Sequence, residues 1–463
     1  MSGEPVRVLR AYRFALDPTP GQVEALRSHC GAQRFAYNWG LGVIKANLGQ
    51  RAAEDSYDVP DDERTPPLNW SAYSLRKTWN RVKDEVAPWW SENSKEAYSS
   101  GLANLAAGLA NWSGSKKGDR KGKPIRFPRF KGRKTTLSCR FTTGAFGLVD
   151  ADRRHVKLPR IGVVRTLEST RKLARHIERG TARIRSATLS HRRGRWFVSF
   201  SVEVDHPARS GAARPSLTAA VGVDLGIAHL AVLSRPVAGV SDEHGMVANP
   251  KHLDHAHRAL RRLQRRAARP RGPDKRTAAT PSKRWEATHA KVNRLHTRVA
   301  NARADSLHRL TTGLAEQSGP VVVEDLNVAG MLRNRRLARH IADTGWGELR
   351  RQLEYKTAWR GGTLIVADRW FPSSKTCSNP ACGAVKAKLR LSQRIYRCDQ
   401  CGLTLDRDVN AARCLAALAA SVDSGASSPS CGATENEPDG NPHKSNLVGS
   451  GYRHGKTHAV NVA

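Results

Sequence analysis

Apolar and polar residues follow a helical period and a period of two in different parts of the chain. After a short alternating segment at 6–14, apolar side chains recur at helical spacing from 23 to 43. Thr19, Pro20 and the glutamine two residues later form a capping box, which predicts where this helix begins. Further helical spacing occurs at 71–86 and 91–112. We therefore expect a helical bundle over about residues 19–112.

The middle of the chain changes to a period of two, which is typical of strands. Alternate positions are apolar through 196–204, which follows a turn at 191–195, and 184–190 supplies the opposite strand. Short strands are expected near Phe141 and Val156. Together these segments predict a small β-barrel.

The last part has the order of elements found in α/β cores. The stretch AAVGVDLGIAHLAVLS predicts a buried strand, a turn at Gly226 and a second strand. Two basic helices, a strand, a helix, a strand and a final helix are expected after it. Their ranges are 257–269, 283–314, 320–324, 345–359, 362–368 and 409–421. The stretch after the final helix has little periodicity, so we expect a disordered tail.

Charge indicates what partner this chain binds. Its 463 residues include 78 lysines and arginines against 41 acidic residues, which gives a formal net charge of +37. Such an excess repels itself unless a polyanion neutralises it, and nucleic acid does so through counterion release. A basic membrane-surface protein is the competing interpretation. It is disfavoured because the sequence has no apolar run of about eighteen residues and no apolar signal core near its start.

We therefore expect a cytoplasmic protein, in which the eight cysteines are thiols or metal ligands rather than disulfides.

A basic segment at 115–134, SKKGDRKGKPIRFPRFKGRK, separates the helical part from the strands. A solvated run of charge is the simplest interpretation of such a segment. Two interleaved phenylalanines favour instead an ordered segment whose cations meet phosphates and whose rings pack or stack. The ten candidate nucleic-acid-binding residues are Lys116, Lys117, Arg120, Lys121, Lys123, Arg126, Arg129, Lys131, Arg133 and Lys134.

Three acidic residues occur where a predicted strand ends or a helix begins. Asp224 and Glu324 close apolar strands, and Asp408 opens the last helix, with Asp406 as a rival. Each alone is an ordinary turn former or cap. Together, on a β-β-β-α-β-α framework, they indicate a ribonuclease-H-type core. Carboxylates converging from separate elements are what a two-metal site requires.

We expect two magnesium ions at this site. One would activate a water for in-line attack on a phosphodiester, and the other would stabilise the leaving 3′ oxygen. The basic residues would position the strand.

Four cysteines form a C-x4-C and a C-x2-C pair separated by fifteen residues. They are Cys377, Cys382, Cys398 and Cys401. Two close pairs on a short hairpin suit one structural zinc ion, and four thiolates leave no open position for catalysis. Four unrelated thiols are the alternative. Because the second pair shortly precedes Asp408, we also hypothesise that the hairpin braces the helix that carries this residue.

Several stretches resemble the TnpB family, which insertion sequences encode and which is related to type V CRISPR effector nucleases. They are FPRFKGRKTTLSCRFTTGAF, GVDLGI, VVVEDLNVAGM, WGELRRQLEYKTAWRGGTLIVADRWFPSSKTCS and CDQCGLTLDRDVNAAR. The resemblance extends over about residues 8–419. One departure is the first cysteine pair, which in the family is usually C-x2-C; the wider spacing affects the loop shape more than metal binding.

The resemblance implies a multidomain fold of the α/β plus α+β class. Its parts would be a ribonuclease-H-like (RuvC) nuclease core, an inserted zinc ribbon, a β-barrel wedge domain and a helical recognition domain. The expected ranges are 1–18 for the first wedge strand, 19–114 for the recognition domain, 115–212 for the wedge, 213–370 and 404–421 for the core, 371–403 for the ribbon and 422–463 for a disordered tail.

The function implied is RNA-guided cleavage of double-stranded DNA, with base pairing to a non-coding guide RNA supplying specificity. The resemblance assigns the catalytic triad to Asp224, Glu324 and Asp408, and the zinc ligands to the four cysteines. We expect a monomer within a ribonucleoprotein in the bacterial cytoplasm, associated with the nucleoid. Two alternatives stay open: a non-catalytic RNA-guided DNA-binding regulator, and a transposase that joins strands itself.

Overall fold

The computed structural model describes residues 6–120, 122–133, 136–150, 152–206, 220–274, 276–277, 279–317, 319–390 and 392–423. Two of the ten candidate nucleic-acid-binding residues, Lys121 and Lys134, lie outside this part, as does the expected tail from residue 424 onward. Residues up to Ala420 form one compact unit, which is the part considered below.

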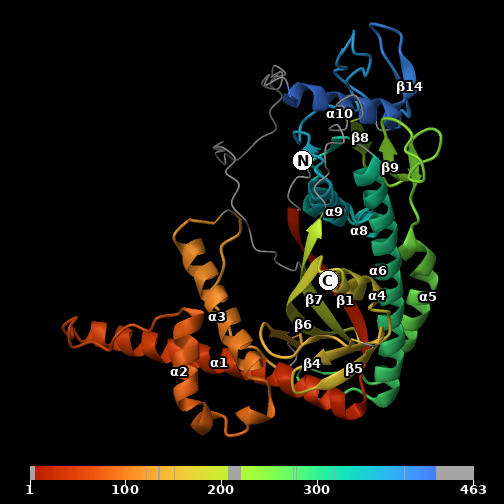
Figure 1. The fold of residues 1–463 in the computed structure, drawn as a ribbon. Helices are drawn as coiled ribbons and strands as arrows, with labels where there is room; N and C mark the ends of the chain where they lie inside the picture. The colour runs from red at the N-terminus through yellow and green to blue at the C-terminus, as the bar shows by residue number, and fades with distance from the viewer. Residues whose placement is uncertain are drawn as a thin grey trace. The chain divides into compact units, whose positions relative to one another are not determined.

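Three helices form the first part, as the spacing predicts (Figure 1). They are α1 (Pro20–Ser56), α2 (Ala72–Val86) and α3 (Lys95–Lys116). The predicted capping box of α1 is confirmed. The third helix begins later than predicted, after a short 3-10 turn at Trp90–Glu92. Ser94 is extended and its hydroxyl accepts the N–H of Glu96, so the α-helix can begin only at Lys95.

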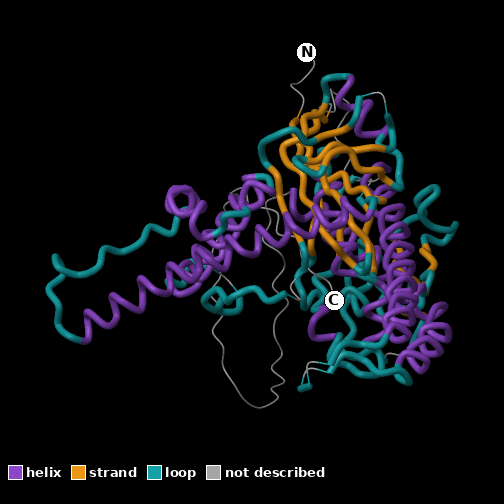
Figure 2. Tube along the Cα trace, turned by 90° about the horizontal axis from the view of Figure 1, so that it is seen from below, coloured by secondary structure: helices purple, strands orange, loops and turns teal. Residues whose placement is uncertain are grey.

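Seven strands form an antiparallel sheet, and they are among the strands drawn in orange in Figure 2. The strands are β1 (Val6–Asp17), β2 (Ser138–Phe141), β3 (Gly147–Leu148), β4 (His155–Leu158), β5 (Gly162–Thr166), β6 (Ala182–Arg192) and β7 (Arg195–His206). Their order is β2-β6-β7-β1-β5-β4-β3. The segment β1 comes first in the sequence but lies in the middle of the sheet. Among the described strands, β2 and β3 form the two edges, and no hydrogen-bonded ladder joins them into the closed barrel that the pattern predicts.

The helices and this sheet share one hydrophobic cluster. Leu26 of α1 and Leu102 of α3 are fully buried together with Phe200 of β7. A short helix, α4 (Arg171–Glu178), lies between β5 and β6 in the chain, and the sequence analysis did not predict it.

A second sheet has five strands in the order β10-β9-β8-β11-β12. They are β8 (Val221–Asp224), β9 (His229–Leu233), β10 (Met246–Ala248), β11 (Val321–Val323) and β12 (Leu364–Val366). The first three strands pair antiparallel, whereas β11 is parallel to both β8 and β12. The helices around it are α5 (His252–Ala267), α6 (Lys283–Gln317), α7 (Val328–Met331), α8 (Ala338–Thr344), α9 (Trp346–Trp359) and α10 (Arg407–Asp423).

Helices cover both faces of this second sheet. Alternate residues of a strand face opposite sides. Val321 and Val323 therefore pack in a cluster with Leu310 of α6 and other residues of α6 and α9. Val322 packs on the other side, with Leu415 of α10. The resulting core is a three-layer α/β arrangement.

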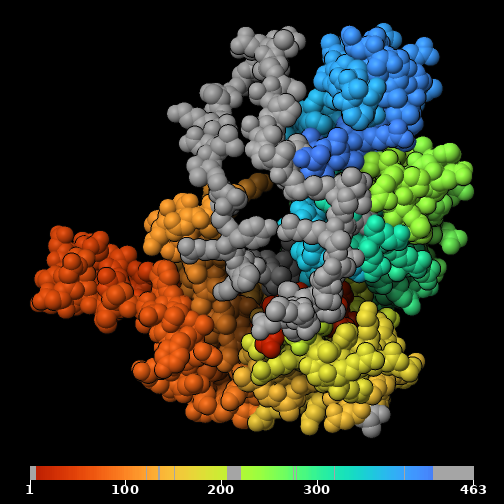
Figure 3. Space-filling view, turned by 45° about the horizontal axis from the view of Figure 1, so that its top comes forward, coloured from red at the N-terminus to blue at the C-terminus, as the bar shows by residue number. Residues whose placement is uncertain are grey.

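A cysteine-bearing hairpin precedes α10. Its strands are β13 (Ile395–Arg397) and β14 (Thr404–Asp406), and Ile395 pairs with Asp406, the residue immediately before the helix. The hairpin and α10 carry the blue colours of Figure 3, where they form a continuous surface. No helix among the described residues is both long and apolar enough to span a membrane.

Candidate functional site

Two of the three predicted acids lie at the same edge of the second sheet. Asp224 is the last residue of β8, and Glu324 directly follows β11. The two strands are parallel, with Val223 beside Val323, so the next residues of each strand also lie side by side.

The third acid reaches this edge through a close contact between a strand and a helix. A Cβ atom on Gly222 would lie 1.9 Å from the carbonyl oxygen of Ala412, so α10 packs backbone to backbone on β8. Gly222 and Asp224 share a face of the strand, and Asp408 lies one turn before Ala412 on the helix. Only glycine allows this approach, and the contact explains how Asp408 comes near Asp224.

Electrostatic effects connect the three carboxyl groups. Burial raises the pKa of Asp224 well above its usual value, and the negative charges of Glu324 and Asp408 raise it further. The pKa of Glu324 is raised mainly by burial, against the hydrogen bond that the Ser373 hydroxyl donates to it at 2.8 Å. The guanidinium of Arg407 contacts the Asp408 carboxylate at 3.0 Å. Three mutually repelling carboxyl groups in a half-buried setting make a site that favours cations.

Asp406, the alternative to Asp408 as a metal ligand, caps the start of α10. Its Oδ1 accepts the N–H groups of Asp408 at 2.9 Å and Val409 at 3.1 Å. These bonds cap the first turn of α10. Its carboxylate is therefore committed to the helix end, whereas that of Asp408 contacts the guanidinium of the preceding residue, Arg407.

The four cysteines predicted as metal ligands lie together. Their sulfur atoms are all within 4.8 Å of one another, an arrangement that could hold a metal ion. Within the described ranges, this set alone has that spacing; the carboxyl groups interact through their charges but are less tightly gathered. Backbone N–H groups of Cys401 and Gln400 lower the pKa of the Cys398 thiol to about 6, which favours the thiolate that a metal requires.

The widened first cysteine pair is accommodated by a local turn. The backbone N–H of Cys382 donates to the carbonyl of Asn379 at 2.9 Å, and the side chain of Asn379 accepts the N–H of Ala381. The extra residues are therefore taken up between the two sulfur atoms without separating them.

A residue that the sequence analysis did not single out connects the cysteine hairpin to α10. The Asn410 side chain is fully buried. It donates to the carbonyl of Thr376 at 2.7 Å and accepts the N–H of Ser378 at 3.0 Å. It therefore holds the backbone on both sides of Cys377 from a position two residues after Asp408. Polar residues on the buried face of a helix signal such a contact, but the sequence does not identify the partner.

The basic segment is an irregular strap on the helical bundle. Phe127 packs edge-on against Trp112 of α3 with ring centroids 4.9 Å apart, and the Lys131 ammonium lies 3.7 Å from the centre of the Tyr37 ring. Burial lowers the pKa of Lys131. The remaining described members of the predicted set are exposed: Lys116, Lys117, Arg120, Lys123, Arg126, Arg129 and Arg133. Phe130 is 55% exposed, and the Lys45 ammonium lies 5.2 Å from the centre of its ring.

The fold and the two sites define a mixed α/β protein with half-buried carboxyl groups and a four-cysteine site that could hold a metal. Family models match three segments: "Helix-turn-helix domain" at 6–52, "Probable transposase" at 199–335 and "Cas12f1-like, TNB domain" at 346–415. In this structure the first segment consists of β1 and most of α1.

Two relatives match over most of their length. One, from Mycobacterium tuberculosis and named "Putative RNA-guided DNA endonuclease", is 39% identical over 419 residues, which cover 87% of this chain and 85% of the relative. Another of that name, from Streptomyces pristinaespiralis, is 35% identical, with 90% and 91% covered. A solved mini-RNA-guided endonuclease, CRISPR-Cas_phi3, matches with a TM-score of 0.44 and 9% identity over 90% of this chain and 92% of that one, too weak a likeness to add to the assignment. The chain belongs to the TnpB family of insertion-sequence proteins.

Proposed function

We propose that this protein is an RNA-guided DNA endonuclease, and that Asp224, Glu324 and Asp408 hold the metal ions for phosphodiester hydrolysis. The observation that carries the proposal is the convergence of two parallel strand ends and one helix start on a single edge. We infer a ribonuclease-H-like (RuvC) core, and the strand order, with three antiparallel strands followed by two parallel ones, supports this inference. The names of the relatives agree with it.

The donor set fits divalent magnesium, a hard cation that takes oxygen ligands. Two bound ions would supply an activated water and stabilisation of the leaving oxygen. The chain itself would do the positioning: Ser373 orients Glu324, Asp406 fixes the first turn of α10, and the Arg407 guanidinium neutralises Asp408 when no ion is held there. Exposed lysines and arginines of the basic segment at 115–134 would bind the phosphate backbone.

Cleavage directed by RNA tests this proposal. The purified protein, loaded with the RNA that co-purifies with it, should cleave a plasmid carrying the matching sequence when Mg²⁺ is present, and EDTA should stop the reaction. Binding without cleavage would favour the non-catalytic regulator. Strand-joining products formed with element ends and without RNA would favour the transposase.

We further propose that the four cysteines bind one structural zinc ion and that the hairpin braces the helix bearing Asp408. Four thiolates fit zinc and leave no position for a substrate. The two bonds of Asn410, and the Cys414 thiol, which contacts the carbonyl of Thr376 at 3.2 Å, support a rigid connection between hairpin and helix.

Replacement of one ligand should therefore affect folding and cleavage together. We expect Cys398→Ser to lower the zinc content below one ion per chain, to reduce the yield of folded protein and to slow cleavage, because metal binding at such sites contributes to folding. Zinc analysis and plasmid cleavage would measure these effects. Cys414→Ser, which keeps a hydrogen-bond donor and all four ligands, is the control. Normal cleavage by a zinc-free Cys398→Ser protein would reject the brace.

Asn410 should act as a positioning residue. Asn410→Ala would remove both hydrogen bonds, leaving the N–H of Ser378 without this acceptor and the Thr376 carbonyl with only the weak thiol donor of Cys414. We expect this to cost about 1–3 kcal/mol and to loosen Cys377 relative to α10. We expect faster zinc release to a chelator and a higher Mg²⁺ concentration for half-maximal cleavage. Asn410→Asp, which keeps the acceptor, should be intermediate. A variant of lower stability with an unchanged Mg²⁺ requirement would show that Asn410 is only structural.

The expected domain boundaries are also part of this proposal. The helices at 19–114 and the strands of 115–212 would form the recognition and wedge parts, although they share a hydrophobic cluster. The exposed cations of the strap, together with Phe130, would contact nucleic acid. The guide RNA and double-stranded DNA are the proposed partners.

A further inference from the structure

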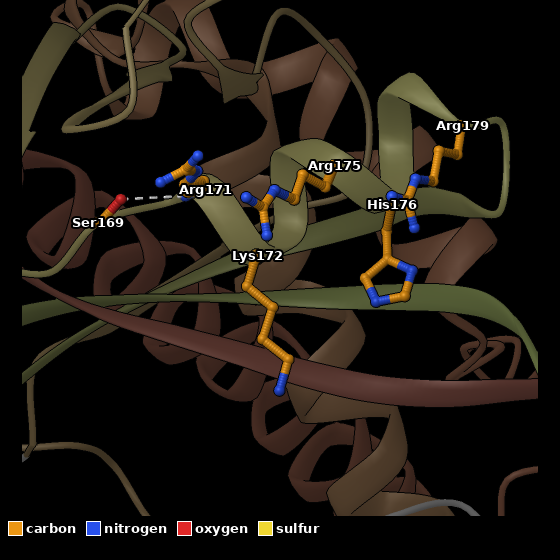
Figure 4. Close-up of a pocket in the computed structure, with 6 residues that line it drawn as sticks. All are labelled: Ser169, Arg171, Lys172, Arg175, His176 and Arg179. Atoms are coloured by element: carbon orange, nitrogen blue, oxygen red, sulfur yellow. Dashed lines mark hydrogen bonds between the residues drawn. The ribbon is translucent and has the colours of Figure 1, made fainter.

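A strongly basic groove lies along α4, far in the sequence from the carboxyl groups (Figure 4). It has a volume of about 680 Å³. Its lining residues are Ser169, Arg171, Lys172, Arg175, His176 and Arg179. The four lysine and arginine side chains are exposed and His176 is half-buried. In the close-up, Lys172 and His176 extend to the same side of the helix.

The helix is anchored by few apolar residues. Leu173 and Ala174 are buried, and the first turn is supported by Ser169, whose hydroxyl accepts the N–H of Arg171 at 3.3 Å. Most of the other side chains of the helix are charged. Arg175 lies four residues from both Arg171 and Arg179, so like charges are neighbours on the helix surface and destabilise it by a few tenths of a kcal/mol per pair.

The positive charge of α4 is not neutralised within the described protein. The acid of the helix, Glu178, pairs with Arg153. Across the described ranges, no ion pair involves Arg171, Lys172, Arg175 or Arg179. Other cations lie close to the helix. The pKa of His176 is lowered mainly by burial and further by the positive charges of Arg10, Lys172 and Arg179. Without an ion-pair partner among the described residues, these four cations are available to an anionic ligand.

We propose that the groove along α4 binds the phosphate backbone of the RNA partner, an inference that rests on the proposed function. Residues four apart on a helix are separated by about 6 Å along its axis, a spacing suited to successive phosphates of one strand. Arginine forks bind phosphate oxygens in bidentate fashion. RNA is favoured over target DNA because the protein holds its guide before it meets any target. Bound RNA would then neutralise the repulsion between the cations of α4 both before and during target binding.

The salt dependence of RNA binding tests the proposal. The variant Arg171→Gln/Lys172→Gln/Arg175→Gln/Arg179→Gln would be compared with the parent in filter binding of the RNA recovered with the parent. We expect the slope of log K against log salt to become shallower by about 3, since each phosphate contact contributes about 0.7–0.9. The control Lys388→Gln/Arg390→Gln/Arg394→Gln/Arg397→Gln removes as many exposed cations from the cysteine hairpin and should change the slope by less than about 1. An equal loss of slope in both variants would overturn the proposal.

Two further measurements test whether the loss of slope comes from misfolding and whether the ligand of α4 is RNA. The Arg171→Lys/Arg175→Lys/Arg179→Lys variant keeps the charge of α4 and should keep most of the slope. If substitution at these positions acted by disrupting the fold, this variant would lose the slope as well. RNA should also protect Lys172 of the parent from amine acylation, read by mass spectrometry, while Lys388 in the same sample stays reactive. Protection by duplex DNA but not by RNA would overturn the assignment to RNA. A parent that binds its RNA no better than unrelated RNA would contradict the proposed function itself, whereas an unchanged slope in the glutamine variant contradicts only the site on α4.

Discussion

Asp224→Ala is expected to reduce cleavage of the matching DNA by about 10³-fold while leaving RNA-directed binding of that DNA intact. Loss of a carboxylate that holds the ions removes several kcal/mol of transition-state stabilisation, and about 4 kcal/mol corresponds to three powers of ten in rate. Binding should persist, because the substitution removes a negative charge from a half-buried acidic group that already repels its neighbours. Single-turnover cleavage and a gel-shift assay with the loaded protein would measure the two effects separately.

A matched control is available on α6. Asp305 is exposed and forms a surface ion pair with Arg309 at 2.7 Å. Asp305→Ala is therefore the same substitution at an exposed position, and it should cost little folding free energy. It should cleave as the parent does. Undiminished cleavage by Asp224→Ala would reject the assignment of this edge as the catalytic site, and loss of DNA binding together with cleavage would point to a structural defect instead.

Gly222→Ala is expected to have the second large effect, although it adds a single methyl group. The new Cβ would overlap the carbonyl oxygen of Ala412, and backbone cannot move aside as a side chain can. Overpacking of this kind costs about 1–3 kcal/mol of folding free energy. The displaced α10 would also carry Asp408 away from Asp224, and a shift of about 1 Å can cost a hundredfold in rate. Thermal unfolding and the rate at saturating Mg²⁺ would report the two consequences.

Gly347→Ala is the corresponding control. This glycine is in the first turn of α9, and a Cβ there would meet nothing within 4 Å. Because alanine is the better helix former, the control should be as stable as the parent or more stable, with unchanged cleavage. Equal cleavage by Gly222→Ala and Gly347→Ala would mean that α10 does not depend on this contact for its position.

Local signals predicted most of the elements correctly. The capping box at Thr19 marks the start of α1, because both of its hydrogen bonds form within four residues. The cysteine spacing likewise predicts a four-sulfur cluster, since two knuckles on one short hairpin need little help from the rest of the chain. Positions of Asp224 and Glu324 at strand ends follow from the apolar runs that precede them.

Short helices with few apolar residues were missed. The helix α4 is eight residues long and carries only two buried residues, Leu173 and Ala174, among its cations, so it offers too few apolar positions for a helical spacing to be recognised. The short helix α8 was missed for a similar reason. Its boundary is a glycine in the left-handed region, Gly345 with φ 71°, which serves as the end of α8 and the start of α9. The sequence analysis assigned that glycine only to the later helix.

The sequence by itself determined the charge, the thiol ligand set, the acidic residues and the order of elements, because each depends on residue type or on contacts between near neighbours. Tertiary structure decided which atoms meet. Only the packing of α10 on Gly222 brings Asp408 to the strand ends, and only the buried amide of Asn410 ties Cys377 to that helix. Such contacts join residues far apart in the chain, so their existence depends on the shape of whole layers rather than on any local pattern.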